Sequence, residues 1–156
     1  MNMSRIVLSS KVRINCSEAV LFACVSNPVM DAHWRKEIQR CDVSVPCAAG
    51  VEYVQYSNLS KRLSNFAQRF VCTHFEPNVG VVFETMPQAL FYQRSERNVR
   101  RIDEGCVEFD YRLEFDSAIA TAALGFPLPV FLIRWAAQRD AHQYLKALKT
   151  HLEKAE

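Results

Sequence analysis

The chain has 156 residues, 49% of them hydrophobic and 23% charged, a globular balance that excludes a disordered chain. Its net charge of +2 is too small to indicate nucleic-acid binding, and its six scattered cysteines form no Cys-x-x-Cys pair, which argues against structural zinc or a disulfide scaffold. We therefore expect a single domain over residues 1–156, reduced thiols, no metal or cofactor, and a cytoplasmic location.

Hydrophobic alternation predicts a strand over residues 5–14, with one face buried. Ser17 or Asn15 can cap a helix that runs to about Val25, and Pro28 favours the first turn of a second short helix that ends near Trp34. Two short helices therefore follow the first strand.

The next eighty residues alternate between strand-like runs and turns. The predicted strands are Ile38–Val45, Val51–Ser57, Ser64–Phe75, Val79–Met86, Ala89–Arg101 and Val107–Phe115. The third of these carries two competing apolar sets, which a β-bulge would reconcile. The last has the clearest alternation of the chain and predicts an antiparallel strand with one buried and one solvated face.

Residues 118–133 carry no charge and read AIATAALGFPLPVFLI. The stretch is shorter than the roughly 20 residues of a membrane-spanning helix, and Pro127 and Pro129 interrupt it. We expect no membrane span. A lid, a homodimer surface and a peripheral contact with a membrane or another protein all remain open.

A long helix is predicted from Leu128 or Val130 to Lys154, with an apolar stripe about 100° wide. The fold class is therefore α+β, a curved antiparallel sheet of about seven strands wrapped around a long C-terminal helix.

This order of elements and several short sequence stretches resemble the START-like superfamily, also called SRPBCC, and most of all its polyketide cyclase/dehydrase branch. The matching stretches are SEAVLF from Ser17, SNP from Ser26, VCTHFEP from Val71, VFE from Val82 and the ending YLKALKTHLE from Tyr144. The resemblance implies the helix-grip fold and a ligand cavity between the sheet and the C-terminal helix. Members include lipid carriers, plant ligand binders and cyclases, so it does not decide whether this chain is an enzyme.

We predict that the domain binds a small hydrophobic molecule: a lipid, a polyketide, an isoprenoid or an aromatic metabolite. The alternative is a cyclase or dehydratase acting in the same cavity. The predicted ligand contacts are aromatic, with one cation. They are Trp34, Tyr53, Phe83, Phe109, Tyr111, Phe115, Phe131, Arg134 and Trp135. The competing interpretation is a core that these rings fill by packing on one another.

Arg134 falls near the centre of the helical stripe and would need a partner if it faced the sheet. A ligand carboxylate or phenolate would suit its forked geometry. The alternative is a side chain that reaches water at the end of the sheet.

Other polar residues favour structural roles. Glu108 and Asp110 share the face opposite Phe109 and so predict a solvated, cross-paired surface, and we interpret the basic run 94–101 as an exposed hairpin. The four histidines lack visible partners for catalysis. No phosphate loop or nucleophile motif is present, and the catalytic residues of an enzyme would be unknown.

Overall fold

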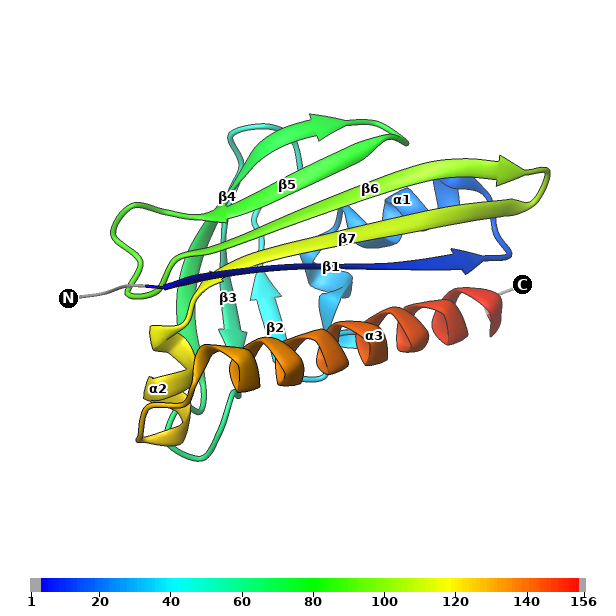
Figure 1. The fold of residues 1–156 in the computed structure, drawn as a ribbon. Helices are drawn as coiled ribbons and strands as arrows, with labels where there is room; N and C mark the ends of the chain where they lie inside the picture. The colour runs from blue at the N-terminus through cyan, green and yellow to red at the C-terminus, as the bar shows by residue number, and fades with distance from the viewer. Residues whose placement is uncertain (1–3, 155–156) are drawn as a thin grey trace.

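The computed structural model describes residues 4–154, which form one sheet and a small number of helices (Figure 1). The elements are, in chain order, β1 (Arg5–Ile14), α1 (Glu18–Val25), the 3-10 helix η1 (Pro28–His33), β2 (Ile38–Asp42), β3 (Glu52–Ser57), β4 (Phe66–Glu76), β5 (Gly80–Thr85), β6 (Gln93–Asp103), β7 (Cys106–Asp116), α2 (Ala118–Leu124) and α3 (Val130–Lys154).

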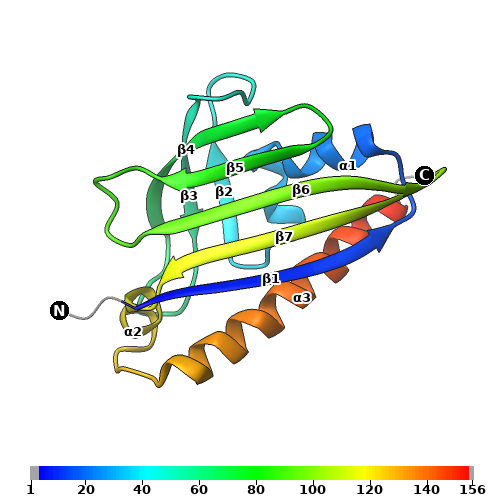
Figure 2. The ribbon, with the colours of Figure 1, turned by 45° about the horizontal axis from the view of Figure 1, so that its top comes forward.

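The seven strands form a single antiparallel sheet in the order β1-β7-β6-β5-β4-β3-β2. The sheet curls, so that β2 and β3 lie across from β1 and β7, and α1 and η1 lie within the curve (Figures 1 and 2). The long helix α3 runs beside the edge strand β1. This arrangement confirms the predicted α+β architecture.

The caps of the first two helices follow from sequence. The Ser17 side chain accepts a hydrogen bond from the Val20 amide, and the Asn27 side chain accepts one from the Val29 amide. Pro28 occupies the first turn of η1, where its missing N–H costs nothing. Both predicted helices are present, the second as a 3-10 helix.

β1 and most of β7 show the alternating burial that the sequence predicts, whereas β5 is buried on both faces. A register shift between Cys72 and His74 confirms the predicted bulge in β4. The prediction that a strand begins at Ala89 is wrong, because β6 begins only at Gln93. In the segment before it, the Phe91 amide donates instead to the Gln68 side chain at 3.1 Å.

The uncharged stretch contains a short helix, α2, that the sequence analysis did not predict. It ends at Gly125, whose φ of 86° lies in the left-handed region that favours glycine at a helix end. Pro127 and Pro129 then separate it from α3. Within residues 4–154, no helix combines the length and the apolar character that crossing a membrane requires.

The helix α3 packs through the predicted stripe. Its buried residues are Ile133, Ala141, Tyr144, Leu145, Leu148 and Leu152. Polar side chains beside this stripe reach the edge of β1, where the backbone has no further strand to bond. The carbonyl oxygens of Val7, Ser9 and Arg13 accept hydrogen bonds from Arg134, Gln138 and Lys149, at 2.9, 2.9 and 2.8 Å.

Candidate ligand-binding interior

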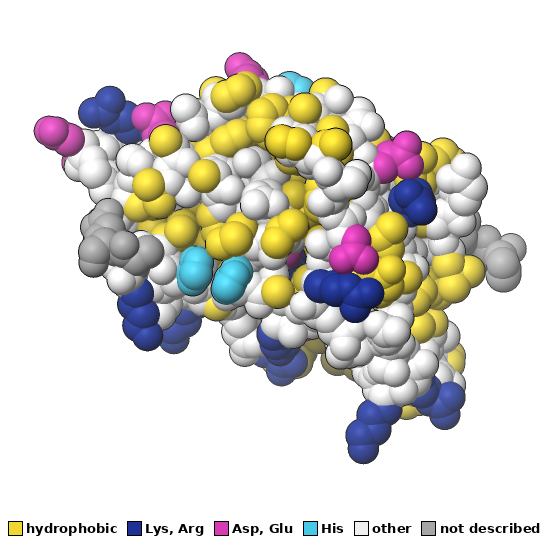
Figure 3. All heavy atoms as spheres, turned by 180° about the vertical axis from the view of Figure 1, so that it is seen from behind, with side chains coloured by type: hydrophobic (Ala, Val, Ile, Leu, Met, Phe, Trp, Pro, Cys, Tyr) yellow, Lys and Arg dark blue, Asp and Glu magenta, His cyan; other side chains and the backbone are white. Residues whose placement is uncertain are grey.

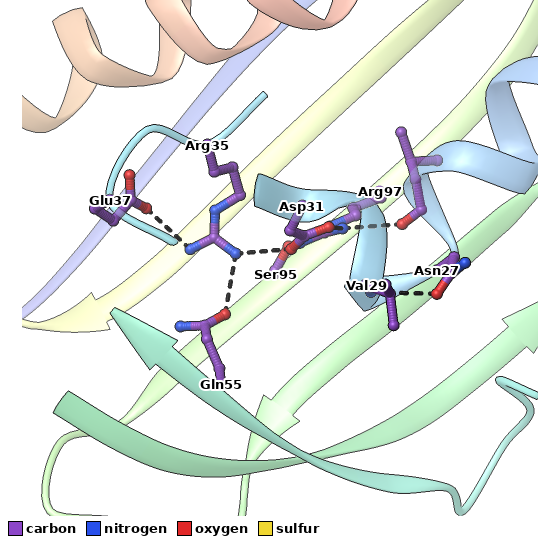
Figure 4. Close-up of polar contacts among 9 residues, drawn as sticks. Asn27, Val29, Asp31, Arg35, Glu37, Gln55, Ser95 and Arg97 are labelled. Atoms are coloured by element: carbon purple, nitrogen blue, oxygen red, sulfur yellow. Dashed lines mark hydrogen bonds and ion pairs between the residues drawn. The ribbon is translucent and has the colours of Figure 1, made fainter. Parts of the chain in front are cut away.

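A buried ion pair joins the sheet to η1 inside the curve (Figure 4). Arg97 of β6 and Asp31 of η1 are both 0% exposed. The guanidinium donates two parallel hydrogen bonds to the carboxylate, at 2.8 and 2.7 Å, and others to the Val25 carbonyl and the Ser95 hydroxyl. Burial disfavours the charged guanidinium, but Asp31 outweighs this and the pKa of Arg97 is raised.

A second arginine extends this network toward α3. Arg35 donates to Asp31 at 3.0 Å, to the Gln55 side chain at 3.2 Å and to Glu37 at 3.2 Å (Figure 4). Burial opposes its charge, yet Tyr111, Glu37 and Asp31 together raise its pKa. Two arginines therefore share one fully buried aspartate, and the remaining contacts come from neutral groups and Glu37.

Some polar atoms around this network have no partner. Among the described residues, the buried side-chain atoms without a hydrogen bond are Trp34 Nε1, Arg35 Nε, Glu37 Oε2, Gln68 Nε2 and Tyr111 OH. An unmade buried hydrogen bond costs about 1–3 kcal/mol, so such atoms call for a partner. Three of the five are N–H donors and Tyr111 can donate as well, so the set suits a molecule with acceptor oxygens.

These atoms belong to neighbouring positions. Tyr111 lies between Ser10 and Arg97 in the strand register, and its ring centroid is 5.6 Å from that of Trp34. Gln68 pairs with Gln55, the residue that accepts from Arg35. The orphaned polar groups therefore lie on the inner side of the sheet around one ion network.

Most of the predicted aromatic contacts pack against one another. Trp34, Tyr53, Phe83, Phe109, Tyr111 and Phe115 are each 7% exposed or less. Trp34 meets Phe109 and Tyr111 edge to face, and Tyr53 meets Phe83 in the same way. This placement agrees with the packed-core interpretation, and the contact of these rings with a ligand stays a prediction.

Accessible apolar side chains lie instead toward α2. Leu113 occupies the inner face of β7 opposite Leu8, yet it is only partly buried. The other partly buried apolar residues that pack on the core at this end are Leu59, Leu63, Phe66, Phe91, Ala120, Leu128 and Ala137. The inner side of the sheet thus carries buried aromatic rings around the ion network, and partly buried apolar side chains toward α2.

The three predicted residues of α3 lie outside this interior. Phe131 is 69% and Trp135 62% exposed, and Trp135 lies under the guanidinium of Arg139. Arg134 is exposed, and its partner is the Val7 carbonyl rather than a buried acid. Of the two interpretations of Arg134, the structure agrees with the side chain that reaches water and not with the inward one, because this part of α3 lies over the edge of the sheet.

The surface also carries hollows along α3. One, of about 330 Å³, is lined by Trp135, Gln138, Arg139, His142, Gln143 and Lys146. A second lies beside the stacked rings of His33 and His151. His74, on the outer face, is exposed near Glu76.

Sequence reasoning missed the ion network. The interpretation of residues 94–101 as exposed is wrong for Arg97, although Arg100 in the same run is exposed and pairs with Glu108. Alternate residues of a strand share a face, so Arg97 lies on the same face as the apolar Val99, which is buried. This alternation was the sequence feature that could have placed Arg97 inside. Its partner Asp31 lies 66 residues away, beyond any local pattern.

The thiols of Cys24 and Cys41 provide a test of how deeply this interior is buried. Burial, with Asp31 adding to it, raises the pKa of Cys24 to about 11 and that of Cys41 to about 12. Because the thiolate is the reactive form, neither should react with Ellman's reagent at pH 8 in the folded protein. Denaturation in urea should expose both, and rapid labelling of either in the folded state would contradict the arrangement.

No protein-family model matches the chain, and no curated protein sequence matches it. Solved structures do match. A START superfamily protein from Mycobacterium smegmatis superposes with a TM-score of 0.74 at 13% identity, covering 96% of this chain and 99% of the other. The Zhui aromatase/cyclase from Streptomyces sp. R1128 gives 0.73 at 9% identity, over 97% and 95%. A conserved protein from Geobacillus kaustophilus gives 0.73 at 8%, over 96% and 97%. At these identities the likeness concerns the fold.

Proposed function

Because this chain has the START-like helix-grip fold, we propose that it binds a small hydrophobic molecule between the sheet and α3, with an acceptor oxygen of the ligand turned toward Arg35 and Tyr111. The observation that carries the proposal is the set of orphaned N–H and O–H groups inside a fully buried network. The partly buried apolar residues near α2 supply the surface for the rest of the ligand.

The ligand class follows from these two regions. Apolar burial contributes about 25 cal/mol per Å², so the hydrophobic body supplies most of the affinity. The polar end sets orientation, because an acceptor oxygen satisfies donors that otherwise stay unpaired. A polyketide, a phenolic compound or an isoprenoid quinone has this combination, and a plain hydrocarbon lacks it.

A paired set of fluorescent probes tests the proposal. Anilinonaphthalene sulfonate carries acceptor oxygens, and N-phenylnaphthylamine has the same apolar body without them. We expect both to bind, and Tyr111→Phe should weaken the sulfonate probe about threefold to tenfold, the range of one hydrogen bond. The neutral probe and the melting temperature should not change, because the Tyr111 hydroxyl has no partner to lose.

Two controls separate this site from the surface. A Phe131→Ser variant removes an exposed ring on α3 and should bind both probes as the wild type does. Native mass spectrometry of the purified protein should detect a bound apolar molecule of low mass. Equal effects of Tyr111→Phe on both probes, or loss of binding in Phe131→Ser alone, would refute an interior site.

The position of Glu37 favours a second candidate function, that of an enzyme that transfers protons in the same region. Its Oε2 is buried and unpartnered, and the carboxylate lies beside Tyr144 of α3, whose pKa is raised by burial and by Glu37. The Glu37 carboxylate and the hydroxyls of Tyr144 and Tyr111, all near Arg35, could transfer protons in a cyclisation or dehydration. Glu37→Gln would then abolish turnover of a synthetic poly-β-ketone while probe binding persists, and equal turnover would exclude this candidate.

A further inference from the structure

Exposed hydrophobic side chains gather where α2 turns into α3. Six of the eleven large hydrophobic residues exposed among residues 4–154 fall within twelve positions here, and they are 39–69% exposed. They are Leu124, Phe126, Val130, Phe131, Leu132 and Trp135. We name this surface the apolar tip. Such a cluster on one turn of the chain is typical of an interaction surface.

The charges around the apolar tip have one sign. Residues 117–139 contain no Asp or Glu, and their formal charges are those of Arg134 and Arg139, both exposed. The β3–β4 loop adds Lys61 and Arg62, also exposed, within residues 53–75, another stretch without an acid. Figure 3 shows Lys and Arg side chains beside hydrophobic ones at the lower right, the end where α2 lies, without Asp or Glu among them.

The two segments form one surface because they touch. The Ser60 hydroxyl donates to the Ala123 carbonyl, which ties the β3–β4 loop to α2. A Cβ added at Gly125 would collide with the guanidinium of Arg62, so that arginine lies directly against the end of α2. The basic side chains of the loop therefore flank the apolar tip itself.

We propose that the apolar tip docks on the surface of an anionic lipid bilayer. Exposed aromatic and aliphatic side chains can enter the interfacial region, while the surrounding lysine and arginines meet lipid phosphates and carboxylates. A second copy of the chain is a poor occupant, because a symmetric contact would bring four basic side chains of each copy together. The docking is peripheral, and it does not depend on whether the interior binds a ligand.

Vesicle co-sedimentation tests the proposal, with phosphatidylcholine vesicles that contain or lack 30% phosphatidylserine. We expect the wild type to bind the anionic vesicles at least tenfold more tightly in 0.1 M salt, and 0.5 M salt should weaken this binding. A Phe131→Ser/Trp135→Ser variant should lose at least tenfold in affinity. Lys61→Gln/Arg62→Gln should lose the preference for phosphatidylserine.

A matched control uses exposed valines elsewhere. Val45 and Val79 are 53% and 47% exposed, and Val45→Ser/Val79→Ser should bind vesicles as the wild type does. Trp135 provides a direct reading, because its emission should shift to shorter wavelength on anionic vesicles while the buried Trp34 stays constant. Circular dichroism confirms that each variant is folded.

Three results would overturn the proposal. The wild type could fail to bind either vesicle, or the control variant could lose as much binding as the tip variant. The wild type could instead sediment as a dimer that Phe131→Ser/Trp135→Ser dissolves, which would assign the surface to a second copy.

Discussion

Replacing Asp31 with alanine is expected to lower the free energy of unfolding by about 3–5 kcal/mol. The carboxylate is 0% exposed and is the acid that both Arg97 and Arg35 contact, so its removal leaves two buried guanidinium groups with neutral partners and Glu37. Urea unfolding followed by circular dichroism measures the change. We expect this variant to be among the least stable single substitutions in the chain.

The matched control is an ion pair on the surface. Arg40 and Asp42 are 58% and 55% exposed and lie 3.3 Å apart, so Asp42→Ala should cost less than about 1 kcal/mol. The Asp31→Ala/Arg97→Ala double variant should cost less than the sum of its single changes, because each single change already breaks the same pair. Additive costs, or a cost of Asp31→Ala as small as that of the control, would show that the pair does not hold η1 to the sheet.

Leu148→Ala should lower the free energy of unfolding by about 2–5 kcal/mol. Leu148 is 0% exposed and lies in the middle of the stripe through which α3 packs, so the change removes buried apolar surface and leaves a void. Lys146→Ala, two residues away on the exposed side, is the matched control and should change stability by less than about 0.5 kcal/mol.

This comparison has a further readout. If the stripe alone holds α3, Leu148→Ala should also speed hydrogen exchange of the α3 amides before the strands exchange. Equal acceleration of hydrogen exchange in the helix and in the strands would mean that α3 and the sheet unfold together. If Leu148→Ala were as stable as Lys146→Ala, the packing of Leu148 would not contribute to stability.

The fold was predictable because its signals are periodic. Alternation in residues 107–115 and the stripe from Ala141 to Leu152 specify which faces are buried, and the observed strand and helix follow them. The cap at Ser17 and the bulge near Cys72 were also local signals. Such local patterns can be recognised without knowing which residues pack against them in the fold.

The candidate site was less predictable because its partners are distant in sequence. Arg97 resembles its solvated neighbours in a basic run, and only the fold brings Asp31 to it. Helix geometry alone left Arg134 with two interpretations, and the structure decides for the exposed one because α3 at that point lies over an exposed strand edge. Aromatic type alone also could not separate rings that pack together from rings that meet a ligand.

The hydrogen bonds from α3 to β1 protect the protein against aggregation through its sheet edge. A strand at the border of a sheet invites another chain to extend it, since its free carbonyl groups form a template for pairing. Here Arg134, Gln138 and Lys149 occupy those acceptors at Val7, Ser9 and Arg13. The opposite border, β2, is only five residues long and has a shifted register, so neither border offers a long regular template for intermolecular growth.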